Sequence, residues 1–551
     1  MIKNLKLLIF CNLIFLIYYL HYYIHFIPNS GLSIVISLMA FIIPGYCWAL
    51  FFKNKINDLI FLTFLTVCIS SLILISGCIF FYISGISISS IKMLVFLFLV
   101  SNTGIFFSKR TENLLNQKSK SKYLILVLFF SIFVYLILYM GATRFIPPLE
   151  DHDMETQGTA YGIIHYLKPH MVTNRGTVYF FAHPLMLHLY IGYTSLFLDQ
   201  LDDLSYYYQS AISAEKELEE KNSKEMLFKN WRSDLKRFFG DPHLLATRMP
   251  NIFFSCLSSI VLFYLLYPIT KSFILSVTGP IIFFSIPEIF VRSSYGGYMA
   301  VTIFFLLIMT YLYMHNNVNE NQRKLFDILL FLSGLFGAFT NQKTVIFAMA
   351  VALMRIFNEK GNIFTKLTSP LSDKIIQGFF LGTMIFWLYG LWVNPRAFYE
   401  DQITYHLAQR FSLDDIQLTS SQILNHSKKF AYPSITEVWK EFSNHLGFPF
   451  LLIATPLTIY SLSRIKEKKA VFGLWFCVGG ILFSLTDWRQ TKHLMLIIPP
   501  LIISTLIFVS KTKLWMRLIF LIIFVFLIYN NIQIIIKLTK DFTTVSPTPI
   551  W

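Results

Sequence analysis

Residues 122–155 read KYLILVLFFSIFVYLILYMGATRFIPPLEDHDME, an apolar run that ends in four carboxylates within six residues. The part from 122 to 143 carries one charged residue, at its start, and is long enough to cross the roughly 30 Å hydrocarbon core of a bilayer as a helix. Backbone amides in lipid must be satisfied within their own segment, which favours a helix there. The stretch therefore predicts a membrane helix that carries an acidic cluster to one bilayer surface.

The rest of the chain repeats the apolar pattern. Of its 551 residues 55% are hydrophobic and 14% are charged, whereas a soluble protein has about 25% charged residues. We expect an all-α polytopic membrane protein with roughly 13 to 15 transmembrane helices and a large external loop that carries interfacial helices. The apolar runs predict helices at 5–28, 31–52, 58–84, 88–107, 122–143, 249–270, 274–292, 298–315, 325–340, 344–356, 374–394, 449–463, 470–486, 493–510 and 515–537.

The distribution of charge predicts the topology. The two long loops, 144–248 and 395–447, hold 20 of the 30 acidic residues but only 16 of the 46 basic ones. The surplus Lys and Arg lie in the short connections, which the positive-inside rule places in the cytoplasm. We therefore expect both long loops outside. The membrane we expect is a bacterial inner membrane. The net charge of +16 is then a topology signal, and we expect no nucleic-acid partner.

The first long loop divides into three parts. Residues 144–181 mix acids, histidines and turn residues, and residues 184–198 are apolar but too short to cross a bilayer. We interpret 184–198 as an interfacial helix on the outer leaflet. Residues 199–240 form a polar insertion with an exposed helix, to which we assign no chemistry. The second long loop is predicted to be partly helical.

All six cysteines lie in apolar runs, where we expect buried residues without a disulfide or metal role.

The acidic cluster from Glu150 to Glu155 is the densest polar feature of the chain. One interpretation is a solvated acidic turn. Four crowded carboxylates also repel one another, which favours a raised pKa on one of them and hence a general base. The same loop continues with His165, Lys168, His170, Arg175, His183 and His188. Carboxylate, imidazole and basic groups gathered at a bilayer surface suit a reaction on a lipid phosphate, whereas the histidine spacing matches no standard zinc pattern.

Several motifs follow in a recognisable order. The membrane helix ends in the acidic cluster, and an aromatic pair with His183-Pro184-Leu185 follows about thirty residues later. Arg248 and Pro250 then open the next membrane helix. This order resembles the GT-C superfamily of glycosyltransferases that use polyprenyl-phosphate sugars, in particular the protein O-mannosyltransferase and aminoarabinose transferase branch. Three later stretches are also similar to that family: FLSGLFGAFTNQKTVIFA with Lys343, NPRAFYEDQITYHLAQRF with His406 and Arg410, and RQTKHLMLIIPPL with Arg489 and Lys492.

The resemblance implies an organisation and an activity. Residues 122–510 would be the catalytic region, with 1–121 as N-terminal transmembrane helices outside the resemblance and 511–551 as a last helix and tail. The protein would move a sugar from a polyprenyl phosphate to a hydroxyl of a lipid, glycan or protein acceptor on the external face. The implied catalytic residues are Asp153, Asp151, Glu150 and His183, and the implied donor phosphate-binding residues are Arg248, Arg410, Lys343, Arg489 and Lys492.

The sequence departs from the family pattern in two places. The family has adjacent Asp and Glu, whereas the acids here are spaced as Glu-Asp-His-Asp-Met-Glu, so Asp151 and Asp153 both remain candidates for the base and we favour Asp153. In IPEIFVRSSYGGYMA the only acid is Glu288, which precedes the turn where some members have an acid. No cofactor follows with certainty from these residues, and a divalent metal stays an open alternative.

Two other classes of function compete with the transferase. A transporter or lipid flippase usually shows internal repeats and ionisable residues at mid-membrane, whereas here the acids avoid the apolar runs and no repeat is visible. A polymerase or ligase of surface polysaccharide would also use lipid-linked sugars and outer loops. For each basic residue at a helix end, snorkelling to the interface is the simpler alternative to phosphate binding.

Overall fold

In the computed structural model, every regular element of the described residues is a helix, and the one pairing between extended segments is an isolated antiparallel bridge between His170 and Tyr179. The all-α fold class is therefore confirmed. The described residues are 5–24, 31–55, 58–107, 118–144, 151–172, 178–181, 183–198, 201–221, 245–294, 297–315, 320–403, 435–485 and 491–544.

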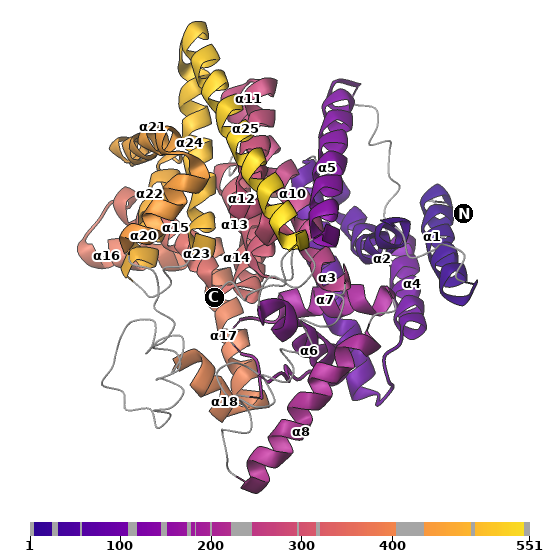
Figure 1. The fold of residues 1–551 in the computed structure, drawn as a ribbon. Coiled ribbons are helices and arrows are strands. Elements are labelled where there is room, and N and C mark those ends of the chain that lie inside the picture. The colour runs from indigo at the N-terminus through magenta and orange to yellow at the C-terminus, as the bar shows by residue number, and fades with distance from the viewer. Residues whose placement is uncertain are drawn as a thin grey trace.

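The α-helices follow the predicted apolar runs closely (Figure 1). Their bounds are α1 (Leu5–Ile24), α2 (Gly31–Ala49), α3 (Leu59–Ile83), α4 (Ser90–Phe107), α5 (Lys118–Arg144), α6 (Asp151–Tyr166), α7 (Met186–Phe197), α8 (Ser205–Lys221), α10 (Leu245–Thr270), α11 (Phe273–Ser285), α12 (Pro287–Ser293), α13 (Met299–Met314), α14 (Glu320–Thr340), α15 (Val345–Asn358), α16 (Ile363–Thr368), α17 (Lys374–Val393), α18 (Pro395–Tyr399), α20 (Ile435–Leu446), α21 (Phe448–Tyr460), α22 (Ala470–Leu485), α23 (Thr491–Leu494), α24 (Ile498–Lys511) and α25 (Leu514–Thr544). Short 3-10 turns lie between some of them, among them η4 (Gln342–Thr344) and η8 (Met495–Ile497).

Several of these helices can cross a membrane by length and composition. Among the residues that the structure describes, five single helices qualify, and the bent pair α11 and α12 makes a sixth span if counted as one. The chain is an integral membrane protein on this ground, and the predicted number of 13 to 15 spans stays a prediction. The five are Leu59–Ile83, Ser90–Phe107, Thr247–Thr270, Lys374–Val393 and Leu514–Lys537.

The run predicted as one helix over 274–292 is broken. α11 ends at Ser285, α12 starts at Pro287, and the two helices meet at 77°. Ile286 between them is extended, with φ −68° and ψ 121°. A residue before proline is kept out of the helical region by the proline ring, so the break follows from Pro287.

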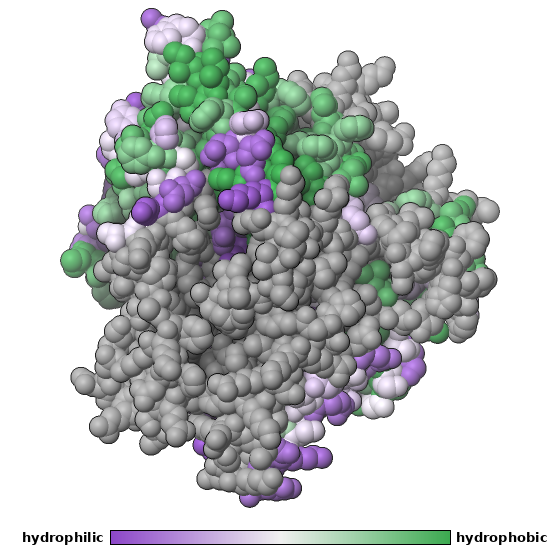
Figure 2. All heavy atoms as spheres, in the orientation of Figure 1, coloured by the Kyte–Doolittle hydropathy of each residue, from purple (hydrophilic) through white to green (hydrophobic). Residues whose placement is uncertain are grey.

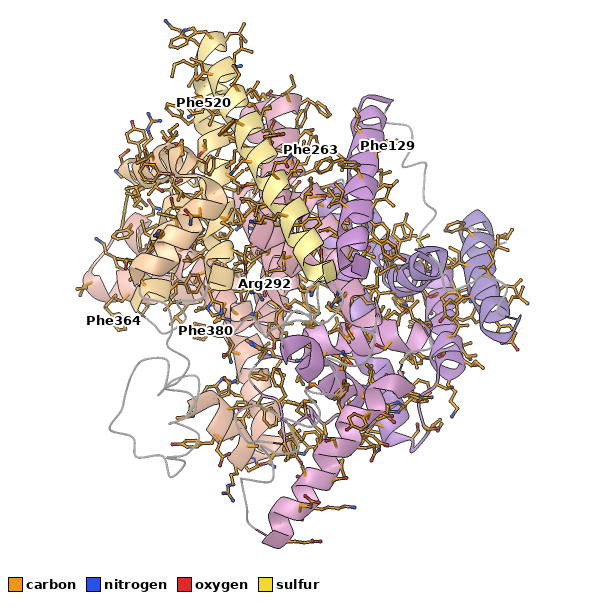
Figure 3. All side chains as sticks on the ribbon, in the orientation of Figure 1. Phe129, Phe263, Arg292, Phe364, Phe380 and Phe520 are labelled. Carbon is orange, nitrogen blue, oxygen red and sulfur yellow. The ribbon has the colours of Figure 1, made fainter. Side chains whose placement is uncertain are left out.

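Two ends of the helix bundle differ in composition. One end, here called the loop end, holds α6, α7, α8 and α18 and lies at the bottom of Figure 1. The opposite end, here called the basic end, holds the connections with Lys271, Arg323, Arg464 and Lys511. In the upper part of Figure 2, around α11, α24 and α25, much of the described surface is hydrophobic. Phe129 on α5 and Phe364 on α16 are 74% and 73% exposed and lie on opposite sides of α25 in the view of Figure 3, as expected of lipid-facing side chains.

α7 confirms the short apolar helix predicted at 184–198, but its surroundings differ from the prediction. Every residue from Met186 to Phe197 is buried, because the helix packs against α2, α3, α6, α10 and α14. The N-terminal helices cover it with hydrogen bonds: the Ser71 and Tyr190 hydroxyls are 2.8 Å apart, and Ser90 Oγ donates to Leu196 O at 2.7 Å. Protein, and not the lipid surface, therefore buries most of its apolar side chains.

Candidate functional site

The structure describes the side chains of three predicted site residues: His183, Arg248 and Lys343. Asp151 and Asp153 lie in the first turn of α6, a helix that the sequence analysis did not predict and whose start suits negative charge because of the helix dipole. Lys492 lies in α23. The side chains of these last three, and all of Glu150, His406, Arg410 and Arg489, lie outside the described residues.

His183 lies in a buried aromatic environment before α7. Its side chain is 8% exposed, and its ring centroid is 3.7 Å from that of Tyr298 at an interplanar angle of 44°. The Phe180 ring is 6.1 Å from His183 and 5.5 Å from His188, which itself lies 6.3 Å from Tyr298. The two histidines of the AHPLMLH stretch thus share Phe180 and Tyr298 as neighbours.

Arg248 lies near the start of α10 and is completely buried, at 0% exposed. One helical turn later, Asn251 donates its side-chain N–H to the Gly297 carbonyl oxygen. Gly297 directly precedes Tyr298, the residue that contacts His183, so Arg248 and His183 lie near the same turn of the chain. A buried guanidinium is stable only where polar or anionic groups compensate it, which makes interfacial snorkelling a poor explanation for Arg248.

Lys343 lies in the turn between α14 and α15 and is 6% exposed. Its ammonium Nζ donates to His493 Nε2 at 2.9 Å. Its backbone N–H donates to Asn341 Oδ1 at 3.0 Å, which closes the turn. His493 follows Lys492 in the RQTKHLMLIIPPL stretch, and no local pattern there predicts its pairing with Lys343.

Asp401 and Gln402, here called the clamp, join the segment before His183 to the turn that holds Lys343. Asp401 Oδ2 accepts the Phe181 N–H at 2.8 Å, and Gln402 donates its side-chain N–H to the Phe181 carbonyl oxygen. Gln402 Oε1 also accepts from Gln342 Nε2 at 3.3 Å, next to Lys343. Both clamp residues were missed, although they lie inside the NPRAFYEDQITYHLAQRF stretch, which was considered only for His406 and Arg410.

The polar insertion packs one face against the site. His170 Nε2 donates to Glu215 Oε2 of α8 at 3.1 Å, and Ala211 and Ala214 of α8 are buried. Burial raises the pKa of Glu215, but the hydrogen bond and charge of His170, with a hydrogen bond from Tyr179, outweigh it and leave that pKa lowered. The predicted exposed helix is thus exposed on one face only.

A metal centre gains no support from the part of the chain that the structure describes. Within it, no three His, Cys, Asp or Glu side chains lie close enough together to hold a metal ion. Glu288, the acid considered for such a site, accepts from Arg292 Nε at 2.7 Å on α12. Metal dependence therefore stays an open alternative.

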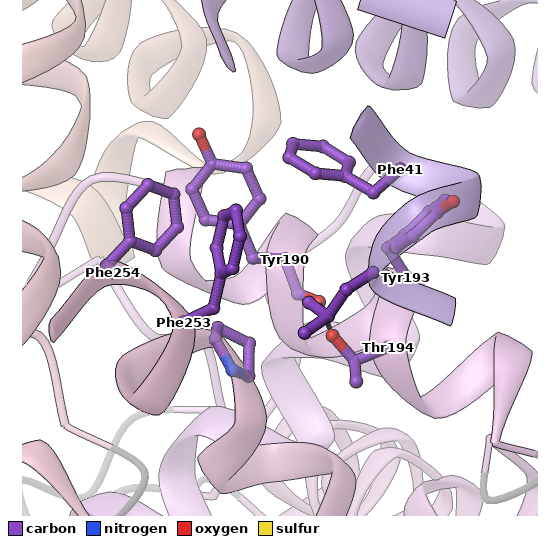
Figure 4. A pocket seen from close by; sticks show the side chains of 8 residues that line it. Phe41, Tyr190, Tyr193, Thr194, Phe253 and Phe254 are labelled. Atoms are coloured by element: carbon purple, nitrogen blue, oxygen red, sulfur yellow. Dashed lines mark hydrogen bonds between the residues drawn. The ribbon is translucent and has the colours of Figure 1, made fainter. Parts of the chain in front are cut away.

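A small apolar pocket lies between α2, α7 and α10 (Figure 4). Phe41, Tyr190, Tyr193, Phe253 and Phe254 provide its aromatic wall, together with Leu38, Thr194 and Pro250. The Thr194 hydroxyl donates to the Tyr190 carbonyl oxygen at 2.7 Å and is thereby satisfied. Pro250 places the pocket beside the buried start of α10.

Comparisons with known proteins assign no family. No family model matches the chain, and no curated protein matches it. Among solved structures, the crystal structure of ArnT from Cupriavidus metallidurans bound to undecaprenyl phosphate has a TM-score of 0.47 at 9% identity. The likeness covers 71% of this chain, which spans 61% of the length of that protein. At this TM-score the likeness assigns neither a family nor an activity.

Proposed function

We propose that this chain is a membrane glycosyltransferase that moves a sugar from a polyprenyl-phosphate carrier to a hydroxyl acceptor. One observation supports the proposal: segments that carry predicted site residues, though distant in the sequence, are linked at the loop end by contacts of neighbouring residues. His183 contacts Tyr298, Arg248 is buried on the helix whose Asn251 bonds the residue before Tyr298, and Lys343 lies beside the Gln342–Gln402 contact. The acidic start of α6 belongs to the same end of the bundle.

The reaction places two demands on the site. A carboxylate takes the acceptor proton while the hydroxyl oxygen forms a bond to the anomeric carbon, and Asp153 or Asp151 has the right chemistry. The bond between that carbon and the phosphate oxygen breaks, and its electron pair leaves with the phosphate. Fixed cations stabilise this charge. Arg248 suits two parallel bonds to phosphate oxygens, whereas Lys343 acts as a point charge.

The remaining assignments follow from the same proposal. Arg410, Arg489 and Lys492 would add positive charge around the phosphate, and Glu150 would contribute to the acidic cluster. His183 would orient the acceptor or the base, since the contact with Tyr298 holds its ring in place. The active site would face the exterior of the membrane. The acceptor could be a lipid, a glycan or a protein, and the sugar is open.

Transfer of labelled sugar from a polyprenyl-phosphate donor by the purified protein tests the proposal. We expect Asp153→Asn to slow transfer about 100-fold or more, within the range for loss of general base catalysis. Asp151→Asn is the paired variant, and Asp202→Asn is the control because this acid is exposed in the same loop. Wild-type rates in both Asp151→Asn and Asp153→Asn would overturn the catalytic assignment.

A transporter is the second candidate, and the break between α11 and α12 is the observation that favours it. Transporters place ions and substrates at broken helices, usually as a pair related by an internal repeat. Among the described residues one such bent pair is found. Solute accumulation by vesicles that contain the protein, without sugar transfer from any polyprenyl donor, would favour transport over the transferase.

A further inference from the structure

The turn from Asn341 to Thr344 lies between α14 and α15 and faces the α23–η8 segment, about 150 residues away in the sequence. α13 packs against both η4 and η8 and so holds the two segments in place. Lys343 and His493 are 6% and 2% exposed. The contact between them is therefore a buried feature of the loop end.

The direction of the Lys343–His493 hydrogen bond is determined by chemistry. A lysine ammonium has three N–H donors and no acceptor, so Nζ donates and His493 Nε2 accepts over 2.9 Å. The proton of a neutral His493 ring must then lie on Nδ1. Because the imidazole brings no negative charge, it orients the ammonium without neutralising it.

Asn341 provides a second observation that points to a ligand. Its Oδ1 accepts the Lys343 backbone N–H, and this bond identifies which end of the amide is oxygen. Its Nδ2 has no hydrogen-bond partner in the part of the chain that the structure describes, although the residue is only 1% exposed. Buried donors without a partner are rare in folded proteins and call for an explanation such as a bound group.

The donors of this turn favour an anion. Asn341 Nδ2 and Lys343 Nζ are both N–H donors, and one of them is charged. Oxygens of a phosphate accept hydrogen bonds and carry the opposite charge, whereas a sugar hydroxyl also needs an acceptor for its own proton. A phosphate group therefore fits the turn better than a sugar ring.

We infer that Asn341 and Lys343 bind the phosphate of the carrier lipid, and that His493 is the positioning residue that aims the Lys343 ammonium at it. This inference rests on the proposed function. In it, the Asn341 amide and the Lys343 ammonium contact the phosphate oxygens, whereas His493 contacts the ammonium and not the phosphate.

Two substitutions at His493 separate positioning from mere packing. Glutamine can present its side-chain oxygen where Nε2 lies, whereas asparagine is shorter and presents its oxygen near the place of Nδ1. The probe is a short-chain polyprenyl monophosphate without sugar, titrated calorimetrically into the protein in detergent. We expect His493→Gln to bind it within about threefold of wild type and His493→Asn to bind about tenfold more weakly, the loss expected for one hydrogen bond to a charged group.

Asn341→Asp tests the unpartnered donor. The change keeps an oxygen for the Lys343 backbone N–H but replaces the Nδ2 donor with a carboxylate oxygen that repels phosphate. We expect binding of the monophosphate to weaken at least about tenfold. His315→Gln is the control, because His315 lies at the basic end and contacts Tyr311 there. Inorganic phosphate, as a second probe, should show the same order of affinities if the headgroup is what the turn binds.

The outcomes distinguish this inference from the proposed function. If His493→Gln and His493→Asn bind the monophosphate equally well, or if Asn341→Asp binds it as wild type does, the inference is wrong even where sugar transfer occurs. If the variants follow the expected order and no polyprenyl donor supports transfer, the phosphate subsite stands and the transferase proposal fails. Unfolding temperatures of the same samples show whether a weak variant has lost its fold, and Gln and Asp are close in size to the residues they replace.

Discussion

At the residue scale, Asp401 shows how a buried charge organises the loop end. Its carboxylate is 1% exposed and accepts the Phe181 N–H, while neighbouring Gln402 donates to the Phe181 carbonyl oxygen. Both backbone groups of one residue are thus held by a segment 220 positions away. Because His183 follows two residues later, this clamp determines where the histidine enters the site.

Loss of the Asp401 carboxylate is expected to destabilise the protein. Hydrogen bonds to charged groups contribute about 1.5 to 3 kcal/mol, so Asp401→Ala should lower the free energy of unfolding by about 2 kcal/mol and reduce transfer as well. The matched control is Glu400→Ala, whose pairing with Arg396 at 3.5 Å is partly exposed and worth about 0 to 1 kcal/mol. Unfolding in detergent measures the difference, and equal stability of the two variants would contradict the role of the clamp.

Glu215 gives the loop end an expected dependence on pH. Burial raises the pKa of Glu215, but the hydrogen bonds from His170 and Tyr179 and the charges of His170 and Lys168 together outweigh it, so the folded-state pKa lies below the ordinary value of 4.5. A carboxyl with a lowered pKa stabilises the fold above its ordinary pKa, and this contribution is lost as the pH falls through the lowered value. The stability difference between wild type and Glu215→Gln should therefore shrink below pH 4.5, measured by unfolding at stepped pH. Glu219→Gln, on an exposed position of the same helix, should show no such change relative to wild type.

At the element scale, the contact of α14 with α17 depends on glycine. A Cβ built on Gly378 would meet the Phe331 carbonyl oxygen, and one built on Gly334 would meet the Ile375 carbonyl oxygen. Gly378 and Gly382 are four residues apart, the small-residue spacing that lets membrane helices approach closely. α14 leads into the Lys343 turn and α17 leads through α18 to Asp401, so this contact sets the spacing of two parts of the site.

Gly378→Ala is expected to push α14 and α17 apart. An added methyl group in a packed contact costs about 1 to 3 kcal/mol, and the backbone of Phe331 cannot move aside as a side chain would. Gly480→Ala is the matched control, because nothing lies within 4 Å of a Cβ built there. We expect the unfolding temperature to fall clearly for Gly378→Ala and not for Gly480→Ala. A similar fall in both variants would contradict the packing interpretation.

At the scale of the whole molecule, charge and loops are segregated. Exposed Lys466 and the neighbouring cations lie at the basic end, whereas α6, α7, α8 and α18 lie at the loop end (Figure 1). Because positive residues favour the cytoplasm, we expect the loop end outside the cell. The proposed reaction would then use a carrier lipid presented on the outer leaflet.

Cysteine labelling in intact cells tests this orientation. We expect a membrane-impermeant maleimide to label Glu219→Cys on α8 and to leave Lys466→Cys unlabelled until the membrane is opened. Both positions are exposed in the structure, so accessibility depends on the side of the membrane and not on burial. The native cysteines are buried or half-buried and should give little background, which the wild-type protein measures. The reverse labelling pattern would place the loop end in the cytoplasm.

The sequence by itself determined the helices and the broad position of the chemistry. Hydropathy and helical period are local properties, so the membrane helices from α3 to α25 could be located from their own residues. The break at Ile286 also had a local signal in Pro287, which the prediction overlooked. The start of α6 also had a local signal, because acidic residues in the first turn favour a helix start.

Only the tertiary structure decided which residues meet. The Lys343–His493 bond spans 150 positions and the Asp401–Phe181 bond 220. Neither pairing has a local pattern, because hydrogen-bond partners are chosen by how the helices pack and not by the residues beside them. The burial of α7 by other helices was not predicted for the same reason. An apolar helix too short to span a bilayer can be covered by lipid or by protein, and its own residues do not distinguish the two.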